Sequence, residues 1–173
     1  MDVMEVIRGR RSVRAFKSED VPSEIVENLI DAARWAPSAG NIQPWKFIVV
    51  RNPEIKRRLA RAALDQAFIE EAPVVIVVCA DEACYSQRYG IRGEALYCIQ
   101  DTAAAIQNIH LVAYALKLGT CWVGAFRENE VREILRVPYG IRPVALIPVG
   151  YSAEAPKPPR RKPVCEIVYY DTF

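Results

Sequence analysis

The chain has 173 residues, half of them hydrophobic and a quarter charged, a composition typical of one globular domain. Its net charge of +2 excludes a strong overall attraction to nucleic acid or to a membrane surface. No apolar run approaches the roughly 20 residues that span a bilayer, and no signal-peptide core is present. Five scattered cysteines and one histidine support neither a disulfide framework nor a metal site, so we expect reduced thiols and a cytoplasmic location.

The first half of the chain predicts three helices and two strands, several of them bounded by proline or glycine. Asn52 followed by Pro53 is a strong helix start, because asparagine caps the first turn and proline fits its first position. The β-branched run from Val74 to Cys79 predicts a strand buried on both faces. In order, we expect a short helix that ends near Gly9 and leaves 10–14 on the loop behind it, a helix over 22–36, an ordered loop over 36–45, a strand over 47–50, a helix over 52–68 and a strand over 74–79.

The second half centres on a long apolar helix, expected over 94–118. Its polar side chains at 100/101 and 107/108 lie seven apart and form one stripe. A helix apolar on most sides needs cover on most sides, which a partner subunit would supply; the alternative is the central helix of a monomer. Tyrosines and glycines break the pattern before it. We also expect a mobile loop, a candidate lid, over 81–93, then strands over 120–123, 144–149 and 167–170 and a helix over 129–136.

The C-terminal segment predicts an extended arm. Six of the twelve prolines lie between residues 143 and 163, where no helical pattern occurs. An arm that ends in a strand has little to pack on within its own domain, so crossing to a second subunit is a natural use for it. Interleaved strands and helices predict an α/β or α+β fold. Neither a Gly-x-Gly-x-x-Gly motif after the first strand nor a Walker loop is present, so any nucleotide cofactor is held in another way.

Three stretches carry residues suited to a phosphorylated planar ring. The run from Arg10 to Arg14, Arg-Arg-Ser-Val-Arg, offers guanidinium and hydroxyl donors that fit phosphate or a polarised carbonyl. The amides of Asn41 and Gln43 can pair with the edge of a heterocycle. Gly124 would let backbone approach a flat ligand closely. Each stretch also has a plainer explanation, namely a solvated basic patch, a rigid turn and a strand end that needs glycine, but their order in one chain favours the ligand.

The chain resembles the FMN-dependent nitroreductase family over nearly its whole length. The resemblance is carried by these three stretches, by Pro-Val-Gly-Tyr at 148–151 and by Arg-Arg-Lys-Pro at 160–163. The resemblance implies an α+β fold in which a mixed β-sheet is flanked by helices. It also implies one FMN-binding domain over 1–173, in an intertwined homodimer whose C-terminal arms, 151–173, are exchanged. Two FMN molecules would lie at the interface, and NAD(P)H would be the electron donor.

The resemblance assigns each matching stretch a part of the cofactor. The arginine-rich stretch would contact the phosphate, the ribityl chain and the pyrimidine edge, and the end of the arm would complete the phosphate site. The amide loop would come from the other subunit. Trp122 would lie against the ring, with the backbone N–H groups of Gly124 and Ala125 near flavin N5; many relatives have two glycines there. The residues implied are Arg10, Arg11, Ser12, Arg14, Ser38, Ala39, Asn41, Gln43, Trp122, Gly124, Ala125, Arg160 and Arg161.

The implied function is an FMN-dependent NAD(P)H oxidoreductase that reduces nitroaromatics, quinones or flavins by ping-pong hydride transfer. The cofactor carries the chemistry, so no side-chain nucleophile, base or metal is required, and Arg14 would stabilise developing negative charge. One alternative is the same fold with dehalogenation, flavin cleavage or product dehydrogenation; another is a non-catalytic anion- or nucleic-acid-binding protein. We expect His110 to be structural, Cys121 to pack, and Tyr85 and Tyr89 to stack on substrate or to be exposed loop residues.

Overall fold

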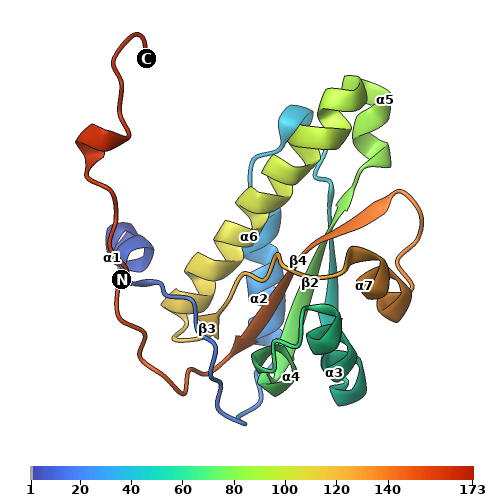
Figure 1. The fold of residues 1–173 in the computed structure, drawn as a ribbon, viewed down its shortest axis with the longest axis vertical. Helices are drawn as coiled ribbons and strands as arrows, with labels where there is room; N and C mark the ends of the chain where they lie inside the picture. The colour runs from blue at the N-terminus through green and yellow to red at the C-terminus, as the bar shows by residue number, and fades with distance from the viewer. Residues whose placement is uncertain (1) are drawn as a thin grey trace.

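The computed structural model describes residues 2–173 and shows an antiparallel sheet flanked by helices (Figure 1). The strands are arranged in the order β1-β2-β4-β3. The parallel component is an isolated bridge between Ser12 and Thr120. This is the expected α+β class. The strands are β1 (Trp45–Val50), β2 (Val74–Asp81), β3 (Gly119–Thr120) and β4 (Ile141–Gly150), and the α-helices are α1 (Val3–Gly9), α2 (Ser23–Arg34), α3 (Pro53–Ala62), α4 (Phe68–Glu71), α5 (Ala83–Arg92), α6 (Cys98–Ala115) and α7 (Glu128–Leu135).

Strand β2 is the centre of the fold and is buried on both faces, as its sequence predicts. Its side chains alternate between two hydrophobic cores. Val74, Ile76 and Val78 face the core under α2 and α6. Val75 and Val77 face the core under α3, α4 and α7. The sheet is therefore covered by helices on both sides.

Helix α3 begins where Asn52 and Pro53 predict, and the Asn52 side chain accepts a hydrogen bond from the Ile55 N–H at 3.1 Å. The sequence predicts that this helix runs to residue 68, but it ends at Ala62. Leu64 and Asp65 follow with φ near +60°, a left-handed conformation that interrupts a right-handed helix. A separate short helix, α4, then leads into β2.

The prediction of a mobile loop over 81–93 was wrong. This stretch forms α5, and a π-helical segment, η2 (Gly93–Tyr97), joins it to α6. Gly90, with φ 58° and ψ −152°, kinks the helix instead of ending it. Tyr85 is fully buried, so it is neither a substrate-stacking residue nor an exposed one. Tertiary packing of this tyrosine stabilises a helix that its internal glycine disfavours.

The other boundary differences lie in the second half. Strand β3 ends at Thr120, and Val123 contributes only an isolated bridge to Leu146. Strand β4 begins at residue 141, earlier than expected. The strand expected over 167–170 is absent from the described chain, where the arm instead contains a 3₁₀ turn, η3 (Val164–Glu166). Figure 1 shows the arm leaving the body of the molecule, so it has no sheet edge of its own chain to pair with.

Two further features of the described chain concern membrane-spanning helices and the cysteines. Among residues 2–173, no helix is both long enough and apolar enough to cross a membrane. All five cysteines are free thiols. Burial raises the pKa of Cys79 to about 12 and that of Cys98 to about 11, so both are protonated at neutral pH.

Candidate functional site

The arginine-rich stretch and the first half of the arm meet at one cavity of about 320 Å³. Backbone pairing explains how segments so distant in sequence come together. The Lys17 N–H donates to the Tyr151 carbonyl, and the Ala153 N–H donates to the Ala15 carbonyl, both at 2.9 Å. The arm then continues past residues 10–14. The cavity is lined by Arg10, Arg11, Ser12, Arg14, Pro156, Lys157, Pro159 and Arg161.

Positive charge at this cavity is not neutralised within the chain. Among residues 2–173, the ion pairs to carboxylates all involve other cations. The nearby acid, Glu154, accepts instead from the backbone N–H groups of Arg14 and Ala15. Arg11 donates to the carbonyls of Arg8 and Arg10, at 2.6 and 2.8 Å, and so caps the end of α1. Arg161 makes one long contact of this kind, to the Arg160 carbonyl at 3.4 Å. Arg10, Arg14, Lys157 and Arg161 therefore keep most of their donors for an anion.

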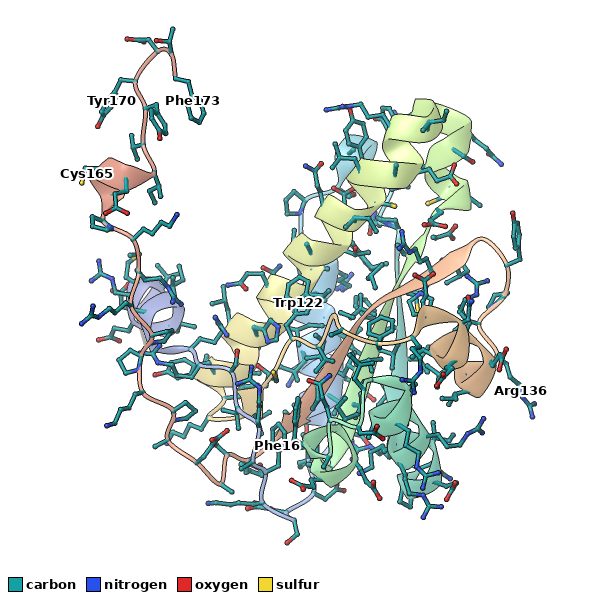
Figure 2. The ribbon with its side chains drawn as sticks, in the orientation of Figure 1. Phe16, Trp122, Arg136, Cys165, Tyr170 and Phe173 are labelled. Carbon is teal, nitrogen blue, oxygen red and sulfur yellow. The ribbon has the colours of Figure 1, made fainter. Side chains whose placement is uncertain are left out.

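The segment after β3 lies beside this stretch. The Val13 N–H donates to the Thr120 carbonyl at 2.9 Å, which sets the start of residues 121–126 next to the arginines. Trp122 is 41% exposed, and Figure 2 shows it beside α6. The N–H groups of Gly124 and Ala125 have no acceptor within residues 2–173. A Cβ on Gly124 would come no closer than 3.9 Å to other atoms, so packing within this chain does not itself require glycine there.

His110 supports Trp122 from the protein side. Its ring stacks on the indole at 5.9 Å between centroids, with an interplanar angle of 26°. Its Nδ1 lies 2.7 Å from Thr120 Oγ1, while its buried Nε2 has no partner in the described chain. Burial, aided by the charge of Arg10, lowers the pKa of His110 to about 4. The imidazole is therefore neutral at physiological pH, which agrees with a structural role.

The amide loop is tightly turned. Gly40, Asn41 and Gln43 all have φ of +57°, in the left-handed region that glycine and asparagine tolerate best. The Asn41 N–H donates to the Ser38 carbonyl at 2.9 Å, and the Gln43 N–H donates to Ser38 Oγ at 3.0 Å. The Gln43 amide also donates to the Asn41 side chain at 3.3 Å. Both amide side chains are exposed, so a rigid turn presents them to the surroundings.

One chain does not bring the amide loop to the arginine cavity. The Ala39 N–H donates to Asp101 Oδ2 at 2.9 Å, near the start of α6. Tyr114, near the other end of α6, instead lines a second cavity of about 360 Å³ together with Arg10 and Arg11. From Asp101 to Tyr114 the helix rises by roughly 20 Å. Arg160 also lies outside the lining of the arginine cavity.

Asp101, Glu154 and Lys157 were missed as candidate site residues. The polar stripe on the long helix pointed to Asp101, but nothing in the sequence around Glu154 and Lys157 shows that the arm returns to the N-terminal segment. No group of three histidine, cysteine, aspartate or glutamate side chains within residues 2–173 could hold a metal ion.

Comparisons with known proteins identify the family of this chain. The sequence model of the nitroreductase family matches residues 7–71 and 61–151. An NADH dehydrogenase of Thermus thermophilus is 34% identical over 197 residues, covering 98% of this chain and 96% of that one. An FMN reductase (NADPH) of Bacillus subtilis is 27% identical over 185 residues, covering 99% and 74%. The crystal structure of a nitroreductase family protein from Streptococcus pneumoniae matches with a TM-score of 0.90 at 26% identity, covering 97% and 99%. The chain therefore belongs to the nitroreductase family, whose members include NAD(P)H-dependent oxidoreductases.

Proposed function

We propose that this protein is an FMN-dependent NAD(P)H oxidoreductase that reduces nitroaromatics, quinones or flavins by ping-pong hydride transfer. The observation that carries the proposal is the arginine cavity in a chain of the nitroreductase family. Arg10 and Arg14 from the N-terminal stretch and Arg161 from the arm line it without a carboxylate partner. Uncompensated like charges held this close are unfavourable unless an anion binds between them.

The residues at the cavity fit a phosphate group. A guanidinium offers paired N–H donors that match phosphate oxygens, and the Ser12 hydroxyl and Lys157 ammonium add further donors. Glu154 is not among the residues that line the cavity, and its carboxylate accepts from the backbone N–H groups of Arg14 and Ala15 nearby. In this assignment Arg10, Arg14 and Arg161 hold the phosphate, while Arg11 mainly stabilises the end of α1.

The ring would extend from the cavity toward residues 121–126. Trp122 presents an exposed indole that His110 holds from behind. The unpaired N–H groups of Gly124 and Ala125 can donate to a ring nitrogen, and the charge of Arg14 favours negative charge on the ring. When bound, FMN supplies the hydride-transfer chemistry. The chain supplies orientation, hydrogen-bond donors and positive potential.

A second copy of the chain would complete the site. The amide loop lies too far along α6 to share a ligand with the arginines of its own chain. The arm carries exposed apolar side chains with nothing of their own domain to cover them, including Ile167, Val168 and Tyr169. We therefore propose a homodimer in which residues 1–173 form one FMN-binding unit and arm 151–173 crosses to the partner. Ser38, Ala39, Asn41 and Gln43 of the second copy would then contact the ring.

The decisive experiment is the visible spectrum of purified protein, followed by anaerobic addition of NADH or NADPH and then of a quinone. We expect a flavin absorption band that bleaches with the nicotinamide and returns with the quinone. Colourless protein that FMN cannot reconstitute would rule the proposal out.

The phosphate assignment predicts the behaviour of an Arg161→Ala variant. Losing a charge-assisted contact should weaken FMN binding by roughly 10- to 100-fold. Binding of riboflavin, which lacks the phosphate, should be unchanged. Fluorescence titration measures both affinities. Arg136→Ala is the matched control, because this exposed arginine points away from the body of the molecule on the side opposite the arm (Figure 2). Equal weakening of FMN and riboflavin by Arg161→Ala would contradict the assignment.

A further inference from the structure

We propose that Asp101 is a positioning residue, whose carboxylate holds the amide loop in the conformation that presents Asn41 and Gln43 to the flavin ring. This inference rests on the proposed function. Asp101 itself faces the loop backbone from α6, so its effect on the flavin passes through residues 38–43.

Two donors from different segments converge on one oxygen of Asp101. The Ala39 N–H donates to Oδ2 at 2.9 Å, and the Tyr85 hydroxyl donates to the same oxygen. Tyr85 is fully buried, and within the described residues Asp101 is the partner of its hydroxyl. Burying a hydroxyl without a partner is costly, so this bond ties α5 to α6 at the point where the loop is attached.

Helix α5 also packs against the loop directly. Arg88 donates to the Gly40 carbonyl at 3.3 Å. A Cβ added to Gly40 would lie 2.5 Å from the Tyr89 hydroxyl, so the loop backbone fits closely under this tyrosine. Tyr89 therefore packs against the loop directly, and Tyr85 supports it through its hydrogen bond to Asp101.

The loop needs such support because of its own backbone. Asn41 and Gln43 both have φ of +57°. Asparagine tolerates this left-handed conformation, but glutamine does so poorly, and at Gln43 it persists only where the surroundings enforce it. Asn108, one stripe position along α6, donates to the Ala32 carbonyl at 3.0 Å. The polar stripe of α6 therefore fixes the last part of α2 through Asn108 and the loop after it through Asp101.

The test compares Asp101→Ala with Asp101→Asn. Alanine removes the acceptor of both donors, whereas asparagine keeps an oxygen that can accept both. We expect Asp101→Ala to weaken FMN and riboflavin binding by the same factor, about 10-fold or more, since the loop contacts the ring and not the phosphate. Asp101→Asn should restore affinity to near the wild-type value. Asp31→Ala is the control, because that carboxylate is exposed and pairs with Arg34.

Amide hydrogen exchange provides a readout that does not depend on flavin. In Asp101→Ala, exchange over residues 39–43 should become faster, while residues 10–14 should exchange as in the wild type. Wild-type flavin affinity in Asp101→Ala would overturn the inference, as would an Asp101→Asn variant that binds as weakly as Asp101→Ala. Failure of wild-type protein to bind flavin would overturn the proposed function instead, and unchanged exchange over 39–43 would separately disprove the anchoring of the loop.

Discussion

At the scale of single residues, the buried His110 makes stability depend on pH. Its pKa is about 4 in the folded chain and about 6.5 when exposed. Between these values the unfolded chain binds a proton that the folded chain does not, so stability falls as the pH is lowered through this window. The full loss amounts to roughly 3 kcal/mol. Urea unfolding from pH 7 to pH 4 measures it.

The His110→Phe variant separates this contribution from the titration of carboxylates. Phenylalanine keeps a ring against Trp122 but cannot take up a proton. We expect the variant to show a shallower fall in stability over the same pH range, whatever its stability at pH 7. Identical pH dependence in the two proteins would show that protonation of His110 does not limit acid stability.

At the scale of elements, the start of α3 provides a clean test of local stability. Asn52 caps the helix through its side chain. Asn52→Ala should cost about 1 kcal/mol, which lowers the Tm of a chain of this size by roughly 3 °C. Asn52→Ser should keep most of the stability, because serine also caps. Thermal unfolding followed by circular dichroism distinguishes the two, and equal Tm values for Ala and Ser would argue against the cap.

The elements also show where sequence is informative and where it is not. Asn52 and Pro53 act within one helical turn, so the start of α3 was predicted correctly. The run from Val74 to Cys79 needs only a buried position, so strand β2 was predicted correctly as well. The helical state of 81–93 depends on the contact of Tyr85 with Asp101, which no local pattern records. The sequence identified the arginines of the N-terminal stretch as candidate anion ligands. It did not show that the arm lines the same cavity, because that depends on pairing between segments that are distant in sequence.

At the scale of the whole molecule, the arm is expected to stabilise the proposed dimer. Its apolar side chains, seen at Tyr170 and Phe173 in Figure 2, are exposed in the single chain, and the proposed second copy would cover them. Deleting residues 164–173 should shift the protein toward a monomer, slightly lighter than the 19.5 kDa of the full chain, in sedimentation velocity, because apolar burial drives association. Arg161 remains in this variant. A truncated chain that stays dimeric at low concentration would show that the arm is not required.

The pairing of residues 15–17 with residues 151–153 also has a consequence for biosynthesis. A nascent chain still lacking residue 161 has its N-terminal arginines without the arm residues that line the same cavity, so the proposed phosphate site is incomplete. Contacts between the two ends of a chain are the slowest to form, since they close the longest loop. In the proposed function, tight capture of the flavin phosphate would thus come late, after translation has passed residue 161, and chains that stop short of that point would bind FMN more weakly.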